Sequence, residues 1–230
     1  MAKRSSRTPF ALIRARCQTP AMNFLDVAVS DYMAGLCERF EHPVLVEMEK
    51  RASEEGFPIV GRTVGAALLT FASAVGARRV MELGSGFGYS AYWFAQAVGP
   101  EGEVILTDGD PANQAKATDY LSRLGVGDRC RFVVGDALES LDNEQGEFDI
   151  IYCDIDKHDY PRAFASARQR IRSGGLYMCD NVLWSGRVAT DDDDEWTQAI
   201  RTHNEAIYAA DDFLPVIVPI RDGVVVALKK

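Results

Sequence analysis

The spacing of hydrophobic residues along the chain changes near residue 79. Before that point, apolar residues recur at intervals of three and four, as Val64, Leu68 and Phe71 do in "GRTVGAALLTFASAV". A single apolar stripe of this kind is typical of a helix that packs against a core. The stretch from about 24 to 75 is therefore predicted to be helical.

After residue 79, short apolar runs alternate with helical patterns. The candidate strands are residues 79–83, 103–108, 130–134, 148–154 and 175–180. The helical stretches lie near residues 89–98, 111–124, 158–172 and 193–210. This alternation favours an α/β fold in which a parallel sheet carries helices on both faces.

The last two apolar runs, "LPVIVPI" and "GVVVALK", are joined by the turn signal "RDG". They predict an antiparallel hairpin that closes one edge of the sheet. Pro215 and Pro219 fit an edge position because proline cannot donate a hydrogen bond to a neighbouring strand. The predicted fold class is therefore α/β, with a central, mostly parallel sheet, helices on both faces and an antiparallel C-terminal hairpin.

The chain has 230 residues, which is enough for one domain of moderate size. Residues 1–16 contain five Lys or Arg and no acid. We interpret residues 1–20 as a flexible basic arm, in preference to a transit peptide. Residues 21–230 are expected to form a single domain with a helical N-terminal cap over about 21–75.

Charge and cysteine content narrow the function classes. The net charge of −9 argues against nucleic-acid binding, which needs clustered Lys and Arg. No apolar run approaches the roughly 20 residues needed to cross a bilayer, so no membrane segment is predicted. The five cysteines are an odd number without a CxxC pair. Free thiols indicate a reducing compartment, and a cytoplasmic location is expected.

A glycine-rich stretch follows the first candidate strand. In "MELGSGFGYS", Gly84, Gly86 and Gly88 allow a tight turn and a close approach of the backbone to a ligand. The helix that begins next favours a negatively charged group at its N-terminus. The dinucleotide fingerprint GxGxxG is not matched, because Tyr89 stands at its third glycine position. This departure disfavours a nucleotide-dependent oxidoreductase.

The ends of the next two strands carry further acids. Asp108 ends "EVILTD", where an acid can accept both hydroxyls of a ribose. With the glycine turn it indicates a ligand that contains adenosine; an ordinary βα turn followed by an exposed acid is the alternative. Asp136 and Ala137, in "FVVGDAL", follow the third strand, where they could contact the adenine edge.

Two candidate strands both end in Cys-Asp, at Cys153-Asp154 and Cys179-Asp180. If the strands are adjacent and parallel, the two aspartates converge at the carboxyl edge of the sheet, where such folds bind ligands. The cysteines then point toward the opposite, packed face. Two carboxylates repel unless one is protonated or a cation lies between them.

With Asn181, the two aspartates form a set of hard oxygen donors that suits Mg²⁺, Mn²⁺ or Ca²⁺. From spacing alone, two unrelated helix-capping aspartates remain the alternative. Lys157 lies three residues beyond Asp154, and a solvated lysine at a helix start is its simpler interpretation. A divalent cation beside it would favour the neutral amine, which can act as a general base.

The three histidines receive no chemical role. His158 is expected in the first turn of the helix that follows Lys157, and Asp156 or Asp159 is expected to cap that helix. His42 and His203 have no partner visible in the sequence.

Together these motifs resemble the cation-dependent S-adenosylmethionine O-methyltransferases of the caffeoyl-CoA and catechol type. The resemblance covers roughly residues 57–230. It includes "MELGSGFGYS" for the cofactor loop, "DIDKHDYP" for a D-A-D-K-x-x-Y stretch, "GGLYMCDNVLWSGRV" for a G-G-x-x-x-x-D-N-x-L-W-x-G-x-V stretch and "PIRDGVVVALKK" for a P-x-x-D-G ending. Ile155 replaces the usual alanine, and "VGRTVGAALL" lacks the family's E-G-Q type. These departures leave the implied metal chemistry unchanged and the substrate open.

The resemblance implies a Rossmann-like class I methyltransferase fold and a set of cofactor contacts. Ser90 corresponds to the hydroxyl that holds the cofactor carboxylate, and Asp108 to the ribose ligand. The residues implied to bind S-adenosylmethionine are Glu82, Gly84, Gly86, Ser90, Asp108, Asp136, Ala137 and Asp154.

The resemblance also implies the reacting groups. Asp154, Asp180 and Asn181 correspond to the metal ligands, with Mg²⁺ as the expected ion and Mn²⁺ or Ca²⁺ as alternatives. Lys157 corresponds to the catalytic lysine, and Trp184 to a tryptophan near the substrate. The implied reaction transfers a methyl group to a catechol-like small molecule with two vicinal hydroxyls, a phenolic substrate.

Two further expectations concern partners. A homodimer is implied by the resemblance alone. If the acidic run "TDDDDEW" borders the entrance of the site, it would repel a polyanionic CoA ester and favour a small neutral phenol. The alternatives to a methyltransferase are a nucleotide-dependent oxidoreductase and a catalytically silent cofactor-binding protein of the same fold.

Overall fold

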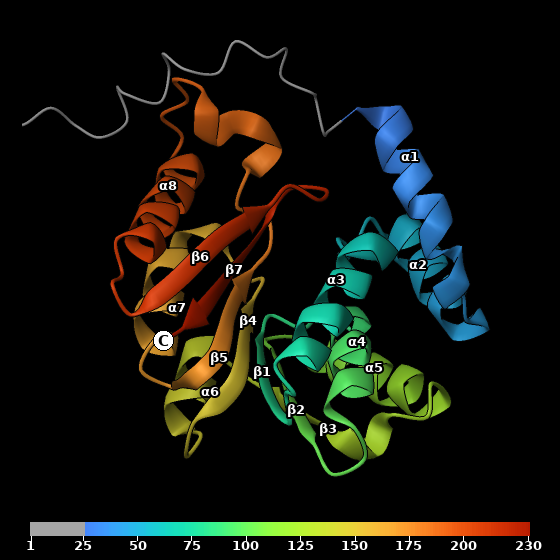
Figure 1. The fold of residues 1–230 in the computed structure, drawn as a ribbon. Helices are drawn as coiled ribbons and strands as arrows, with labels where there is room; N and C mark the ends of the chain where they lie inside the picture. The colour runs from blue at the N-terminus through green and yellow to red at the C-terminus, as the bar shows by residue number, and fades with distance from the viewer. Residues whose placement is uncertain (1–25) are drawn as a thin grey trace, which may run out of the picture.

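The computed structural model describes residues 26–230. The basic arm predicted for residues 1–20 lies outside the described residues, as does the start of the predicted cap. Seven strands form one sheet, and helices cover both of its faces (Figure 1). No helix among residues 26–230 combines the length and apolar character that crossing a bilayer requires.

The sheet is parallel except at its C-terminal hairpin. Its strands are β1 (Arg79–Leu83), β2 (Glu103–Asp108), β3 (Cys130–Val134), β4 (Phe148–Cys153), β5 (Ile171–Cys179), β6 (Phe213–Val218) and β7 (Val224–Lys229). Their order is β3-β2-β1-β4-β5-β7-β6. Strand β7 pairs antiparallel with both β5 and β6. The predicted hairpin is confirmed, and Pro215 lies in the edge strand β6.

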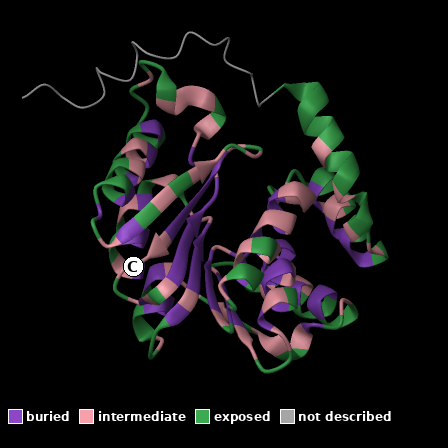
Figure 2. Ribbon diagram, in the orientation of Figure 1, coloured by how far each residue is buried: buried purple, intermediate pink, exposed green. Residues whose placement is uncertain are grey.

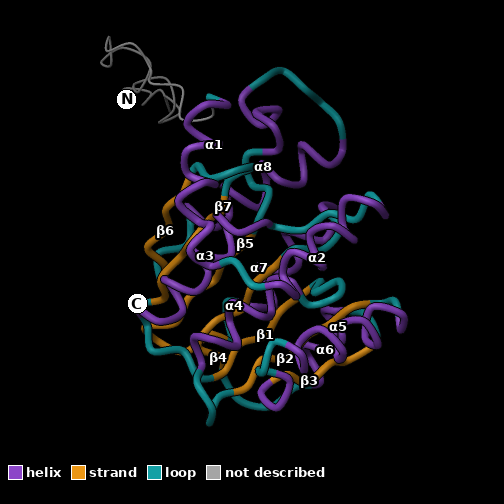
Figure 3. Tube along the Cα trace, turned by 90° about the vertical axis from the view of Figure 1, so that its right-hand side faces the viewer, coloured by secondary structure: helices purple, strands orange, loops and turns teal. Residues whose placement is uncertain are grey.

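The chain has helices on both faces of the sheet, together with a first helix that contributes no buried residue. They are α1 (Val27–Leu36), α2 (Pro43–Glu55), α3 (Gly61–Ala74), α4 (Tyr89–Val98), α5 (Pro111–Arg123), α6 (Ala137–Asn143), α7 (Tyr160–Ala167) and α8 (Glu195–Tyr208), with short 3₁₀ turns η2 (Cys37–Phe40), η3 (Gly127–Arg129), η4 (Lys157–Asp159) and η5 (Trp184–Ala189). Helices α2 to α5 pack on one face and α6 to α8 on the other (Figures 1 and 3).

The stretch predicted to be helical contains α1, α2 and α3. On α3, Val64 and Leu68 are fully buried, as the apolar stripe predicts. Helix α2 begins at a cap that the sequence did not reveal, because His42 Nδ1 accepts a hydrogen bond from the Val44 N–H at 3.2 Å. Helix α2 and the segment between α2 and α3 form the wall that covers one side of the site described below.

The main difference from the predicted elements lies between β4 and β5. The sequence pattern predicts a helix to residue 172, but α7 ends at Ala167 and β5 begins at Ile171. Here the Phe148 N–H donates to the Arg170 carbonyl oxygen at 2.7 Å. Pairing with β4 therefore places in a strand residues that the local periodicity assigns to the helix.

Two hydrophobic clusters, one on each face, hold the central strands between them, and Figure 2 shows these strands as the most buried part of the ribbon. Cys153 and Cys179 are fully buried in the cluster under α7 and α8, so their predicted place in the core is confirmed. The cysteines that the structure describes are free thiols.

The strand order fixes where a ligand can bind. Strand β1 lies between β2 and β4, so the chain leaves β1 on one side and later returns on the other. Open α/β sheets bind ligands in the crevice at such a switch point, beyond the carboxyl ends of the strands. The segments after β1, β2, β4 and β5 all meet at this edge.

Candidate active site

A cavity of about 780 Å³ opens at the carboxyl edge of the sheet. Its walls come from the glycine loop after β1, the ends of β2, β4 and β5, the segment between α2 and α3, and the turn between β6 and β7. The predicted site residues that line it are Gly84, Gly86, Ser90, Asp108, Asp154, Lys157, Asp180, Asn181 and Trp184. The fold thus brings most of the predicted residues into one cavity.

The glycine loop passes close to the end of β4. Gly84 has φ +81°, and a Cβ at this position would overlap the carbonyl oxygen of Asp154. The Asp154 N–H in turn donates to the Leu83 carbonyl oxygen at 2.8 Å. Only glycine satisfies both the backbone conformation and the contact. The loop therefore depends on Gly84 for its path through the switch point.

Asp108 ties this loop to the next strand. Its Oδ2 accepts a hydrogen bond from the Gly86 N–H at 3.0 Å. Its Oδ1 accepts from the Asp110 N–H at 2.8 Å and from Asn113 Nδ2 at 3.0 Å. A carboxylate oxygen can accept more than one hydrogen bond, so Asp108 can order the loop and still accept from a ribose hydroxyl.

Glu82 is fully buried beneath the glycine loop and does not itself line the cavity. Neither of its carboxylate oxygens has a hydrogen-bond partner among residues 26–230. Burial raises the pKa of Glu82 to about 7, and the nearby hydroxyls of Ser90 and Ser85 offset this shift only in part. Glu82 therefore lies behind the glycine loop and outside the cavity lining, and its contact with a cofactor stays a prediction.

Asp136 and Ala137 stand apart from this group. Asp136 caps α6, because its Oδ1 accepts from the N–H groups of Leu138 and Glu139 at 2.9 and 2.8 Å. Neither Asp136 nor Ala137 is part of the cavity lining. Their contact with an adenine stays a prediction.

The acid–base cluster predicted at the ends of β4 and β5 forms a connected network. Cys153 and Cys179 are paired in the parallel ladder, which places Asp154 and Asp180 side by side. Lys157 Nζ donates to Asp154 Oδ1 at 3.1 Å and to Asn181 Oδ1 at 2.9 Å. The positive charge of Lys157 therefore lies between the Asp154 carboxylate and the Asn181 amide oxygen.

Asp180 is the most deeply placed member of the cluster, with an exposed fraction of 3%. Burial, and then the charge of Asp154, raise the pKa of its carboxyl to about 7. Its Oδ1 accepts from the Asn181 N–H at 2.9 Å. Asn181 has φ +57°, a left-handed conformation that asparagine tolerates, and this bend turns its side chain toward Lys157.

These side chains fit a hard divalent cation. The Asp154 carboxylate and the Asn181 amide oxygen converge on the Lys157 ammonium, and the Asp180 carboxylate lies beside them in the lining of the same cavity. The two carboxylates are too few by themselves, and no cluster of three or more His, Cys, Asp or Glu suited to a metal exists among residues 26–230. Asn181 is therefore needed as the third protein ligand, and remaining positions would be open to water or substrate.

The segment that carries Trp184 is strained and held from the β6–β7 turn. Trp184 and Ser185 have φ values of +48° and +51°. The Asp222 carboxylate accepts from the Ser185 N–H, and the Asp222 carbonyl oxygen accepts from the Leu183 N–H at 2.9 Å. The indole Nε1 of Trp184 is buried without a hydrogen-bond partner in the described part of the chain. Trp184 thus forms a fixed wall of the cavity.

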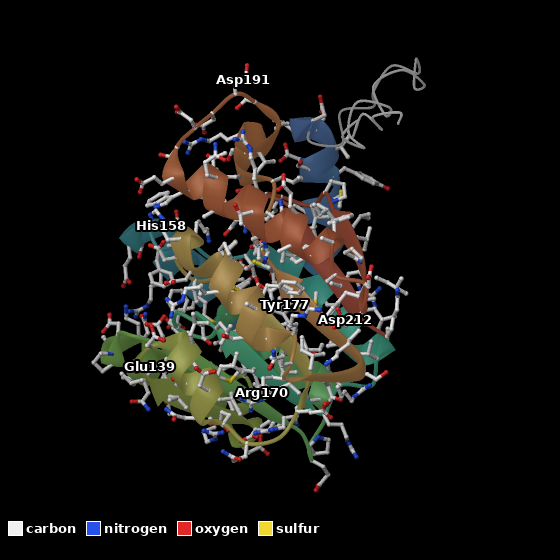
Figure 4. The ribbon with its side chains drawn as sticks, turned by 90° about the vertical axis from the view of Figure 1, so that its left-hand side faces the viewer. Glu139, His158, Arg170, Tyr177, Asp191 and Asp212 are labelled. Carbon is white, nitrogen blue, oxygen red and sulfur yellow. The ribbon has the colours of Figure 1, made fainter. Side chains whose placement is uncertain are left out.

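Trp184 also packs against a second tryptophan, a contact that the sequence did not indicate. The rings of Trp184 and Trp196 are 5.9 Å apart and edge-to-face. Trp196 Nε1 donates to His158 Nε2 at 2.6 Å. His158 therefore has a structural partner, although it lies on the outside of the molecule, as Figure 4 shows. Asp156 caps the 3₁₀ turn η4, in which His158 lies, because its side chain accepts from the His158 N–H, whereas Asp159, the residue before α7, makes no capping side-chain hydrogen bond.

The acidic run before α8 is used locally. Asp192 pairs with Arg187 and accepts from the Thr197 hydroxyl at 2.8 Å. Asp194 caps α8, and Asp191 lies at the outer end of the loop in Figure 4. None of these residues lines the cavity. The structure therefore gives no support to the predicted repulsion of a CoA ester.

The sequence missed a network that joins the glycine-loop helix to the cap. The Tyr89 hydroxyl donates to Glu49 Oε1 at 2.7 Å, and Arg62 donates to both oxygens of Glu49 at 2.7 and 2.8 Å. Tyr89 and Glu49 both line the cavity. Tyr89 stands at the position of the third glycine of the dinucleotide fingerprint. This unusual residue was the one sign of the network in the sequence, but the sequence did not show that Glu49 is its partner.

A second supporting network reaches the site from α8. Asn204 Nδ2 donates to the Val182 carbonyl oxygen at 2.9 Å, directly after Asn181. This leaves Asn204 Oδ1 to accept from His203 Nδ1 at 3.2 Å, so His203 Nε2 accepts from the Tyr177 hydroxyl at 3.0 Å. His203 is fully buried, and burial lowers its pKa to about 4.

We expect His203 to make the fold sensitive to acid. Its folded pKa is below the ordinary value of 6.5, so its contribution to stability is complete above pH 6.5 and is lost as pH falls toward 4. The loss amounts to roughly 3 kcal/mol. The free energy of unfolding, measured with denaturant at several pH values, should fall less steeply with decreasing pH in His203→Gln than in the unchanged chain. His42→Asn, which keeps a capping side chain, is the control; equal slopes for His203→Gln and the unchanged chain would contradict the prediction.

Comparison with known sequences identifies the family. The model of the O-methyltransferase family matches residues 36–230. The catechol O-methyltransferase of Mycobacterium tuberculosis is 36% identical over 138 residues, which are 60% of this chain and 63% of that relative.

Solved structures give the same result. An O-methyltransferase from Bacillus cereus in complex with SAH is 27% identical, with a TM-score of 0.79 over 88% of this chain and 97% of that one. The O-methyltransferase TomG from Streptomyces achromogenes, in complex with SAM, is 27% identical, with a TM-score of 0.76 over 83% of this chain and 91% of that one.

The fold and the cavity together define a class I, S-adenosylmethionine-dependent methyltransferase. The chain belongs to the O-methyltransferase family, so the resemblance drawn from its motifs is confirmed. This result excludes the nucleotide-dependent oxidoreductase that the glycine loop alone left open.

Proposed function

We propose that this chain transfers a methyl group from S-adenosylmethionine to one hydroxyl of a catechol-like phenol, with a divalent cation, Mg²⁺ first, held by Asp154, Asp180 and Asn181. The observation that carries the proposal is the convergence of these three oxygen donors with Lys157 in the same cavity as the glycine loop. A protein that only bound the cofactor would have no need to hold two carboxylates together at this cost in electrostatic energy.

The cofactor half of the cavity is assigned to the glycine loop and its neighbours. Gly84 and Gly86 let the backbone approach the methionine part, and Ser90 lies at the start of α4, where a helix N-terminus favours a carboxylate. Asp108 faces the ribose. Glu82, fully buried beside Ser90 and Ser85, lies behind this loop.

The acceptor half is assigned to the ends of β4 and β5. Asp154, Asp180 and Asn181 would hold a divalent cation there, and such a cation would supply Lewis-acid chemistry that favours the ionised form of an acceptor hydroxyl. Lys157 lies beside Asp154 and Asn181, where its amine can take up or stabilise that proton. Trp184 fixes the plane of the ring, and the rigid strand ends hold the oxyanion in line with the methyl group.

One experiment separates this function from its alternatives. Purified protein is incubated with S-adenosylmethionine and a panel of catechols, flavonoids and CoA esters, in Mg²⁺, Mn²⁺, Ca²⁺ or a chelator. Methylation of catechols that stops in chelator and returns with Mg²⁺ is the expected result. Binding of S-adenosylhomocysteine by calorimetry without methylation of any acceptor would instead indicate a catalytically silent cofactor-binding protein.

Replacing Lys157 by alanine should lower kcat by about 100-fold or more, because a positioned base contributes roughly that much. The measurement is kcat against pH with a saturating catechol. Lys157→Arg keeps the charge between Asp154 and Asn181 but cannot accept a proton at these pH values, so it should also be slow. A rate for Lys157→Ala that equals that of the unchanged enzyme at every pH would remove Lys157 from the base role.

We also propose that residues 21–230 work as one domain, that the enzyme is a homodimer, and that it is cytoplasmic. The free thiols of the described cysteines support a reducing compartment. The dimer rests on the family resemblance and is tested by light scattering of the full chain.

A further inference from the structure

The turn between β6 and β7 brings a cation to the mouth of the cavity. Arg221 lines the cavity and has φ +47°, a conformation that a non-glycine residue adopts only at a cost in energy. Its neighbour Asp222 holds the segment that carries Trp184. Backbone strain that a fold maintains next to a binding cavity is a reason to look for a function.

The guanidinium of Arg221 is positioned by a contact across the cavity wall. Arg221 Nη1 donates to the Ile59 carbonyl oxygen at 2.6 Å, which joins the C-terminal turn to the segment between α2 and α3. Gly61 leaves room for it, since a Cβ there would lie 3.2 Å from the same nitrogen. The side chain is therefore fixed in place although its residue is exposed.

Most of the donor capacity of Arg221 is unused. A guanidinium carries five N–H donors, and a single hydrogen bond to one carbonyl oxygen engages one of them. Arg221 forms no ion pair with any acid of residues 26–230. Lys157, the other cation in the lining, is bound by Asp154 and Asn181. Arg221 is thus a lining cation without an ion-pair partner among residues 26–230.

Arg221 belongs to the acceptor half of the cavity. The Leu183 N–H donates to the Asp222 carbonyl oxygen at 2.9 Å and the Val182 N–H to the Gly223 carbonyl oxygen at 3.1 Å, so the turn that carries Arg221 is bound to the segment between Asn181 and Trp184. The residues assigned to the cofactor, Gly86 and Asp108, are tied instead to each other. An anionic group on the acceptor would therefore meet Arg221 while its hydroxyls lie at the ends of β4 and β5.

We propose that the acceptor is an aromatic acid, a catechol ring with a carboxylate substituent, and that Arg221 binds this carboxylate. The inference rests on the proposed function. Two parallel N–H donors of a guanidinium match the two oxygens of a carboxylate, which makes arginine the suited partner. This reverses the preference for a neutral phenol that the acidic run before α8 predicts, because those acids are engaged in local contacts away from the cavity.

The test compares kcat/KM for 3,4-dihydroxybenzoate with that for catechol, which lacks only the carboxylate. The unchanged enzyme should favour the acid by about tenfold or more, since one charge-assisted bidentate contact contributes about that much. Arg221→Asn keeps a residue that tolerates the left-handed backbone, and it should reduce the acid-to-catechol ratio about tenfold. Arg221→Lys should restore part of the ratio. Lys50→Gln removes an exposed charge outside the cavity and should leave the ratio as it is.

The outcomes show whether Arg221 binds a carboxylate of the acceptor or the carboxylate of S-adenosylmethionine. An acid-to-catechol ratio near one in the unchanged enzyme, or a ratio that Arg221→Asn preserves, would overturn the inference while catechol methylation still supports the proposed function. A tenfold higher KM for S-adenosylmethionine in Arg221→Asn with the ratio preserved would assign Arg221 to the cofactor carboxylate, and also overturns it. No transfer to either acceptor would overturn the proposed function and the inference together.

Discussion

Alanine at Asp154 or Asp180 should abolish methyl transfer while S-adenosylhomocysteine still binds. Each substitution removes one of two carboxylates from a set of three protein oxygens. A divalent cation would then lack the ligands to stay in place, and the several kcal/mol that it contributes would be lost, a fall of about 1000-fold or more in rate. Methyl transfer to a catechol and calorimetry with S-adenosylhomocysteine are the two measurements.

Binding of the metal itself gives a direct control. Mn²⁺ binding can be measured by electron paramagnetic resonance. The unchanged protein should bind about one Mn²⁺ per chain, and both variants should lose this binding. Asp191→Ala removes an exposed acid at the outer end of the loop before α8 and should change neither measurement. Full activity of Asp154→Ala and Asp180→Ala in a chelator would eliminate the metal assignment.

Alanine at Gly84 should abolish cofactor binding and destabilise the fold. The backbone at φ +81° costs about 1–2 kcal/mol for a residue with a Cβ. The added Cβ would also overlap the Asp154 carbonyl oxygen, so the glycine loop and the end of β4 must move apart. Displacement of the loop by about 1 Å can cost 100-fold in rate. Thermal unfolding and calorimetry with S-adenosylhomocysteine measure the two effects.

Gly35→Ala provides the matched control for this prediction. Gly35 lies in α1 with nothing within 4 Å of an added Cβ and without a left-handed backbone. Alanine should be neutral or slightly stabilising there, because it restricts the unfolded chain and favours helix. Unchanged affinity for S-adenosylhomocysteine in Gly84→Ala would mean that the loop does not bind the cofactor through its close path.

Much of the fold follows from local patterns. The bounds of β1, β2 and β3 agree with the apolar runs, since strand length is set by short runs between turn residues. The end of α7 does not, because pairing with β4 decides where β5 begins. Periodicity describes how a segment can fold by itself, whereas a ladder hydrogen bond depends on a neighbour that is distant in the sequence.

The candidate site also follows in part from local sequence and in part from tertiary packing. The sequence alone determined the glycine loop and the acids at strand ends, because each is a short motif whose residue types are dictated by sterics or charge at one place in the chain. Adjacency of β4 and β5 also followed, from the rule that consecutive parallel strands are usually neighbours. The structure confirms that adjacency and brings Asp154, Asp180 and Asn181 together.

Only the tertiary structure decided which other residues surround that cluster. Arg221 and Ile59 meet across 162 positions of sequence, and Tyr89 and Glu49 across 40. No local pattern marks either pair, because each contact exists only when the cap, the sheet and the C-terminal hairpin have packed. The sequence therefore determined which residue types stand at the ends of the strands that border the cavity, and packing decided which side chains form its other walls.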